Sequence, residues 1–184
     1  MKKQVWVYGL ICGAIVSVTM AIGMITASRS GGDKVGSNTM MVIGYLSMLI
    51  AFSLIFVAVK TYRDKQANGV ISFGKALGMG LLIVLIASTM YVLTWAFVHH
   101  NYMPDFMDKY AAATLEKAKA TTTPEEFTRL STEMEEYKAL YKSPVGFALM
   151  SYAEIVPMGL LVSLIAALVL KRKRVPSMGE SRTE

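Results

Sequence analysis

The stretch VGFALMSYAEIVPMGLLVSLIAALVL, residues 145–170, decides the fold of this chain. It is an apolar run that ends against four consecutive basic residues, 171–174. The hydrocarbon core of a bilayer is about 30 Å thick, and ~20 helical residues cross it. Inside lipid, every backbone polar group must find its partner within the segment or a closed barrel, so an α-helix is expected. We therefore predict a transmembrane helix whose basic end lies in the cytoplasm.

Three more apolar runs precede it, at about residues 5–27, 39–59 and 76–98. Hydrophobic residues make up 54% of the chain and charged residues 17%, whereas globular proteins average roughly 45–50% and 25%. We predict an all-α membrane protein with four transmembrane helices in a single membrane domain, residues 1–184. A cleaved signal peptide at the first run is disfavoured, because its apolar core exceeds the usual ~7–15 residues.

One sizeable polar segment, residues 104–142, separates the third and fourth runs. Within it, Thr123, Pro124 and Glu126 form a typical helix start. Apolar residues then recur at helical spacing, at Phe127, Leu130, Met134, Tyr137 and Tyr141. We predict an extracytoplasmic amphipathic helical hairpin that folds over the bundle or lies along the membrane surface. Its apolar face either binds a partner or only contacts the bundle, and the sequence leaves both open.

The basic residues are unevenly distributed along this topology. With both termini in the cytoplasm, the cytoplasmic segments, including the basic tail 171–184, hold eleven basic residues and three acids. The outer segments then hold eight basic residues and nine acids. Because positive charge concentrates in the cytoplasmic loops of membrane proteins, we predict that both termini are cytoplasmic.

Glu154 is the most unusual residue, because it is a carboxylate inside a predicted span. Counted from Phe147, near which the chain enters the membrane from the outside, it lies roughly 10 Å deep at ~1.5 Å per residue. A charged side chain near the membrane centre costs about 3 kcal/mol on insertion scales. Pro157 has no N–H, so the carbonyl of Ala153 loses its helical partner close to this carboxylate. We expect the bundle to shelter Glu154.

Residues at the same depth on the neighbouring spans are the candidate partners of this carboxylate. Counting along antiparallel helices brings Trp95 and several hydroxyl side chains to its level. We predict an intramembrane polar site made of Glu154, Pro157, Tyr45, Tyr91 and Thr19. Two roles stay open: a buried acid that holds helices together through hydrogen bonds, and a proton- or cation-responsive group in transport or gating.

Tyr62, Arg63 and Asp64 stand at the cytoplasmic end of the second span. Arg63 can pair with Asp64 or with a lipid phosphate, and tyrosine is enriched at membrane interfaces. Anchoring at the interface is the favoured role of these residues. Docking of a cytoplasmic or membrane partner is the alternative.

Small residues recur every four positions in the first span, at Gly9, Gly13, Ser17 and Ala21. Such a stripe lets another helix approach closely. We favour packing against a helix of the same bundle over dimerisation of two chains.

Other chemistry finds little support. His99 and His100, with Met103 and Met107 nearby, offer ligands that suit Cu(I), but their spacing matches no metal motif and methionine is also a common packing residue. Cys12 is the single cysteine, so no disulfide forms within the chain. The sequence contains no nucleophile–base arrangement, no phosphate-binding glycine loop and no HExxH motif. We predict no enzymatic activity, no cofactor and no metal.

Nucleic acid is not an expected partner. The net charge is +6, but the basic residues gather at the ends of the spans and form no face interleaved with aromatic residues. The expected partners are the lipid bilayer, a second copy of the chain or another membrane protein.

Several short motifs occur in a fixed order along the chain. They are GYLSML (44–49), IFV (55–57), YRDK (62–65), ISFGKA (71–76), PDF (104–106) and EIVPMGL (154–160). In this order they resemble a bacterial family of four-span inner-membrane proteins known only as a domain of unknown function. The resemblance covers nearly the whole chain and implies a multi-pass helical protein of the bacterial inner membrane, but it brings no activity, ligand or partner.

Two functions follow from these observations. The preferred hypothesis is a non-enzymatic membrane module that forms oligomers or binds a partner. The alternative is a small proton- or cation-linked transporter or channel subunit that uses Glu154.

Overall fold

The computed structural model describes residues 1–30 and 37–172, so most of the predicted basic tail lies outside the described residues. In chain order the helices are α1 (Lys2–Arg29), α2 (Asn38–Gln66), α3 (Phe73–Tyr102), α4 (Phe106–Lys119), α5 (Pro124–Lys142) and α6 (Pro144–Leu170). Within residues 1–30 and 37–172 there is no strand, and the only β-type contact is an isolated bridge that joins Ile71 to Arg172. The prediction of an all-α protein is confirmed.

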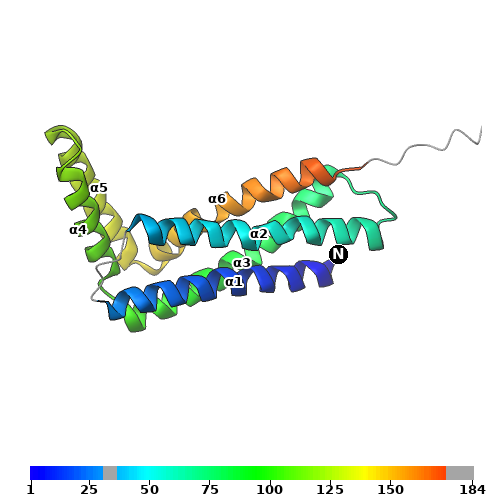
Figure 1. Ribbon diagram of the computed structural model, residues 1–184, viewed down its shortest axis with the longest axis horizontal. Helices are drawn as coiled ribbons and strands as arrows, with labels where there is room; N and C mark the ends of the chain where they lie inside the picture. The colour runs from blue at the N-terminus through cyan, green and yellow to red at the C-terminus, as the bar shows by residue number, and fades with distance from the viewer. Residues whose placement is uncertain (31–36, 173–184) are drawn as a thin grey trace, which may run out of the picture.

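Four of the helices form an elongated bundle, in which α1, α2, α3 and α6 run along the longest axis of the molecule (Figure 1). α1 packs against α2 and α3, and α6 packs against the same two helices. α1 and α6 therefore occupy opposite corners of the bundle. In the described part of the chain, these four are the helices long and apolar enough to cross a membrane. The four predicted spans are confirmed, and each helix extends at least one residue beyond the apolar run that predicted it.

The bundle buries an apolar core and also exposes large apolar side chains on its outside. Phe52, Ile55 and Ile155 are fully buried, whereas Leu93 is 67% exposed and Val169 is 65% exposed. Exposed apolar surface costs roughly 25 cal/mol per Å² in water, but lipid tails are as apolar as leucine and remove that cost. The protein is a multi-pass integral membrane protein.

Two small residues of α1, Gly9 and Gly13, face α3. A Cβ atom added to Gly9 would lie 2.9 Å from Cβ of Ile86, and one added to Gly13 would lie 3.2 Å from Cα of Ala87. These two glycines therefore allow the α1 and α3 backbones to approach closely. The expectation that the stripe packs inside one bundle is confirmed at both positions.

Both described ends of the chain lie at the same end of the bundle (Figure 1). The amino group of Met1 donates a hydrogen bond to Oε1 of Gln66 (2.8 Å), at the end of α2. Beyond α6, Arg172 exchanges two backbone hydrogen bonds with Ile71, in the connection between α2 and α3. That connection turns at Asn68 and Gly69, whose φ angles of 49° and 78° are left-handed, as the Asn-Gly turn signal predicts.

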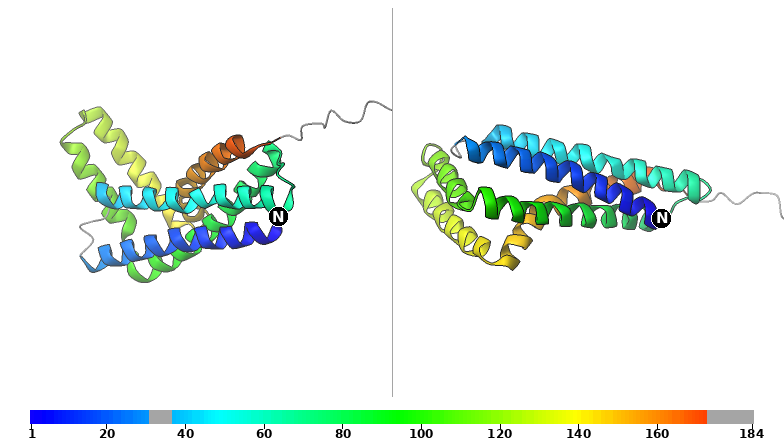
Figure 2. Two further views of the ribbon diagram at one scale, coloured as in Figure 1. Left: turned by 45° about the vertical axis from the view of Figure 1, so that its right-hand side comes forward. Right: turned by 90° about the horizontal axis from the view of Figure 1, so that it is seen from below.

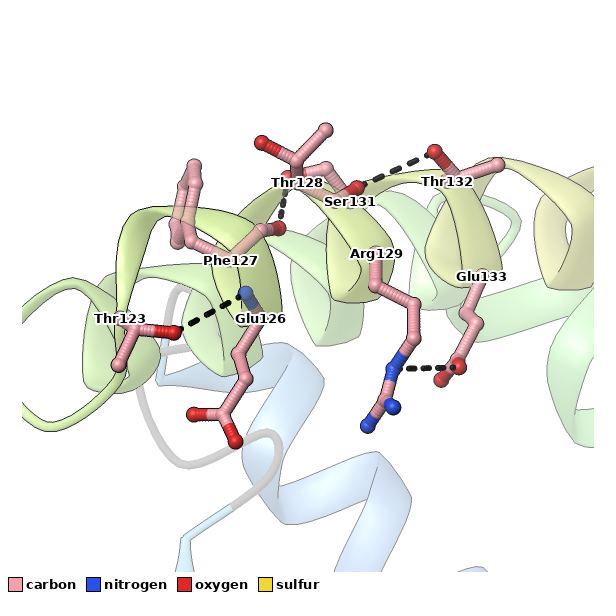
Figure 3. Close-up of polar contacts among 8 residues, drawn as sticks. All are labelled: Thr123, Glu126, Phe127, Thr128, Arg129, Ser131, Thr132 and Glu133. Atoms are coloured by element: carbon pink, nitrogen blue, oxygen red, sulfur yellow. Dashed lines mark hydrogen bonds and ion pairs between the residues drawn. The ribbon is translucent and has the colours of Figure 1, made fainter.

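The other end of the bundle carries α4 and α5, which lie side by side and run across the bundle rather than along it (Figures 1 and 2). Figure 3 shows the start of α5, where the backbone N–H of Glu126 donates to Oγ1 of Thr123 (3.3 Å) and Pro124 takes the first helical position. The predicted helix start is confirmed. The placement of this α4–α5 pair outside the cytoplasm stays a prediction.

Candidate functional site

The structure brings Glu154 of α6 against Tyr91 of α3. The hydroxyl of Tyr91 donates a hydrogen bond to Oε2 of Glu154 (3.0 Å), and Tyr91 is itself buried. Two residues earlier on each helix, the hydroxyls of Thr89 and Tyr152 share a hydrogen bond of 2.9 Å. Residues two apart on a helix point in roughly opposite directions. The two hydrogen bonds therefore flank the contact between α3 and α6, and they tie these two helices together within the span.

The bundle shelters Glu154 only in part, because its carboxyl group is bound by the buried Tyr91 while the residue as a whole is exposed. Its side chain is exposed on the outside of α6, as is that of Pro157. The cause is the position of α6, which packs against α2 and α3 and leaves its remaining face open, while α1 lies at the opposite corner. Glu154 thus leaves part of its surface open to whatever surrounds the bundle at this depth.

The other predicted members of the polar site are not all brought to Glu154. The hydroxyl of Thr19 donates to the carbonyl of Ile15 on its own helix (2.9 Å), at the corner opposite α6. Tyr45 is 43% exposed. Equal depth along the chain predicted these partners, but it did not specify which way each helix faces.

Pro157 lies inside α6, which continues from Pro144 to Leu170. Without an N–H it cannot donate to the carbonyl of Ala153. The carbonyl oxygen of Ala153, the residue before Glu154, therefore lacks its usual helical donor. Chemically, the exposed part of the site is a carboxyl group and a nearby backbone acceptor, and Tyr91 supplies the hydroxyl donor.

The family of the chain follows from its match over residues 7–172 to the family model described as "Protein of unknown function (DUF4199)". The chain belongs to the DUF4199 family. No curated protein and no solved structure matches it. Glu154 and Tyr91 lie within the matched residues, so the polar site belongs to the DUF4199 region of the chain.

An aromatic cluster at the end of this DUF4199 bundle was not predicted. It joins α3, α4, α5 and α6 through Trp95, His99, Phe106, Tyr141 and Phe147. The ring centroids of Trp95 and Phe106 are 4.9 Å apart, as are those of Tyr141 and Phe147, distances typical of favourable aromatic pairs. The indole N–H of Trp95, placed by depth beside Glu154, donates instead to the hydroxyl of Tyr141. Burial raises the pKa of the Tyr141 hydroxyl, which stays neutral at physiological pH.

His99 packs against two other rings of this cluster. Its ring centroid lies 5.3 Å from that of Phe147 and 5.5 Å from that of Tyr141. Met103 is completely buried and packs in a small cluster with Ala27. Among residues 1–30 and 37–172, no group of three or more His, Cys, Asp or Glu side chains is placed to hold a metal. The aromatic content of the segments next to the spans was the available signal for this cluster.

The residues around Tyr62 tie helices together at the basic end of the bundle. Tyr62 is buried, with the ammonium group of Lys75 lying 5.2 Å from its ring centroid. Arg63 pairs with Asp64 (2.7 Å) and donates to the carbonyl of Leu170 at the end of α6 (3.5 Å). These contacts serve the bundle itself. Docking of a cytoplasmic partner by these residues stays a prediction.

Proposed function

We propose that this protein is a non-enzymatic module of the bacterial inner membrane that works by assembling with a second copy or with another membrane protein. Both termini would lie in the cytoplasm. The charge at the two ends of the bundle supports this orientation, because the end that carries both described chain ends is strongly basic. In the described part of the chain, Asp64 is the only acid at that end, against Lys2, Lys3, Lys60, Arg63, Lys65, Lys75, Lys171 and Arg172.

The exposed carboxyl group of Glu154 carries the proposal of assembly. It lies well inside α6, about 15 Å from the start of that helix at Pro144 at 1.5 Å per residue. Facing lipid, an ionised carboxylate costs about 3 kcal/mol or more. The Tyr91 hydroxyl satisfies only part of the hydrogen-bonding capacity of Glu154, since a carboxylate has about four acceptor sites. A polar side chain from a neighbouring helix would satisfy the rest, and polar residues commonly join helices within membranes.

A non-enzymatic role is the simpler reading of the same group. Within residues 1–30 and 37–172, the hydrogen-bond partner of Glu154 is the Tyr91 hydroxyl. A general acid or base needs a second reacting group within hydrogen-bonding reach. A tyrosine that already donates to the carboxyl group instead stabilises the helix contact.

We expect Glu154→Gln to weaken assembly while leaving the bundle folded. The glutamine amide oxygen can still accept from Tyr91, but the negative charge is lost. The association constant should fall by about tenfold, or ~1.4 kcal/mol. It is obtained from the assembled fraction, which is measured by light scattering in lipid nanodiscs and by cross-linking in native membranes. Glu136→Gln, on the exposed face of α5, is the matched control. An unchanged association constant for Glu154→Gln would contradict the proposal.

The alternative function is a small proton- or cation-linked transporter or channel subunit that uses Glu154. An intramembrane carboxylate beside Pro157 favours it, because such acids often mark ion pathways. A single four-span chain is small for a carrier, so this function would also need an oligomer. Proton and cation flux into proteoliposomes separates the two. Flux that Glu154→Gln abolishes, with assembly intact, would establish the alternative.

A further inference from the structure

A groove between α1 and α3 opens at the basic end of the bundle. It consists of two adjoining hollows of about 390 and 660 Å³, which share Met1 and Leu82 in their walls. We call the two together the α1–α3 groove. Apart from Lys2, Lys75 and Thr89, its lining is apolar.

Gly78 of α3 lines the groove and adds no side chain to it. A Cβ atom added there would meet no other atom within 4 Å. Further along, Gly9 and Gly13 bring α1 tightly against Ile86 and Ala87. The groove therefore runs along the surface of the contact between α1 and α3, from Lys2 and Lys75 to Thr89 and Met90.

The groove has the length and polarity of one leaflet of a bilayer. From Lys75 to Thr89 the α3 backbone rises about 21 Å at 1.5 Å per residue. Half the hydrocarbon core is about 15 Å, so the remainder corresponds to the headgroup level. Lys2 and Lys75 stand at the mouth of the groove, at the basic end of the bundle. The far end of the groove, at Thr89 and Met90, carries no charge.

The cations at the mouth select the charge of the occupant. Lys2 and Lys75 are exposed, and Lys75 is held by its contact with the Tyr62 ring. In the part of the chain that the structure describes, no acidic side chain lines either hollow. A second copy of the chain docked by the same face would bring the same cations together, which is unfavourable. An anionic headgroup is complementary, and basic pockets between membrane helices bind such headgroups.

We propose that the α1–α3 groove is a binding site for an anionic phospholipid of the leaflet at the basic end of the bundle. The headgroup phosphate lies between Lys2 and Lys75, and one acyl chain lies along the groove past Gly78 and Leu82 towards Thr89. The site is separate from Glu154, so it does not depend on the assembly proposed above.

The test measures lipid retained by the full chain in a neutral detergent, by native mass spectrometry. The probes are phosphatidylglycerol and phosphatidylcholine with the same acyl chains. We expect wild type to prefer phosphatidylglycerol by about tenfold, as two lysines near a headgroup imply. The double variant Lys2→Gln, Lys75→Gln should lose this preference, whereas Lys60→Gln, Lys171→Gln, at the same end but outside the groove, should keep it. Equal retention of the two lipids by wild type would overturn the proposal.

Filling the groove gives a second arm. Gly78→Leu should lower phosphatidylglycerol retention about tenfold, because the leucine side chain occupies the acyl-chain path. Gly44→Leu is the matched control, since a Cβ at Gly44 also meets no other atom within 4 Å and it lies in α2, outside the groove. Inorganic phosphate should not displace the lipid. Equal phosphatidylglycerol retention by the two leucine variants would contradict an acyl-chain site, as would displacement of the lipid by phosphate alone. A lipid-free dimer that Gly78→Leu blocks would instead assign the groove to a second copy of the chain.

Discussion

Gly159→Leu is expected to destabilise the packing of α6 on the bundle. A Cβ atom at this position would lie 2.5 Å from Cγ2 of Val84 and 3.2 Å from Cζ of Phe52. Both neighbours are buried, Phe52 completely, so neither can move into free space. Overpacking a well-filled core costs typically 1–3 kcal/mol and occasionally more, and leucine adds three carbons beyond the Cβ that already clashes.

This cost is large against a total stability of about 5–15 kcal/mol. The thermal unfolding midpoint in detergent should fall by about 10 °C, since 1 kcal/mol shifts it by ~2–4 °C at this chain length. Gly44→Leu makes the same chemical change where the added Cβ meets nothing, and its midpoint should stay close to that of wild type. Similar midpoints for the two variants would show that α6 does not approach α2 and α3 as described.

Gly146→Ala is expected to release the α4–α5 pair from the bundle by breaking the junction of α5 and α6. The added methyl group would overlap the carbonyl oxygen of Leu140 and lie 2.7 Å from Oγ of Ser143. Ser143 holds this junction, because its hydroxyl accepts from the N–H of Gly146 (2.9 Å) and also lies 3.1 Å from the Leu140 carbonyl. One methyl group therefore disturbs the backbone turn and the helix cap together.

Amide hydrogen exchange followed by mass spectrometry measures this effect segment by segment. Exchange in α4 and α5 should accelerate at least about tenfold, the equivalent of ~1.4 kcal/mol of local opening, while the four spans change little. Gly74→Ala is the control, because Gly74 also follows a serine cap, Ser72, and an added Cβ there meets no other atom within 4 Å. Unchanged exchange in α4 and α5 of Gly146→Ala would refute the proposed role of the junction.

Local features of the sequence predicted much of the fold. The length and apolar character of each run predicted the four spans, because the bilayer sets both requirements. The Thr123 cap and the Asn68–Gly69 turn were predicted for a similar reason, since each depends on the chemistry of a few consecutive residues. Such features do not depend on how the neighbouring helices pack.

The rotation of each span about its axis could not be predicted in the same way. Lipid-facing and core-facing residues are both apolar, so the spans carry little of the one-sided pattern that marks a helix in water. Thr19 and Tyr91 were therefore equal candidates as partners of Glu154, although only Tyr91 bonds it. The exposed side of Glu154 and the aromatic cluster around Trp95 depend on how helices distant in the sequence cross, which no local pattern specifies.

Membrane topology is the central claim, and labelling of single cysteines tests it most directly. Cys12 is buried in α1, so it should not react, and a cysteine can be introduced at Ser72, between α2 and α3, or at Thr122, between α4 and α5. A membrane-impermeant thiol reagent added to intact spheroplasts should label Thr122→Cys at once and Ser72→Cys only after the membrane is opened. Labelling of Ser72→Cys in intact spheroplasts, or of both sites from one side, would contradict four crossings with both ends in the cytoplasm.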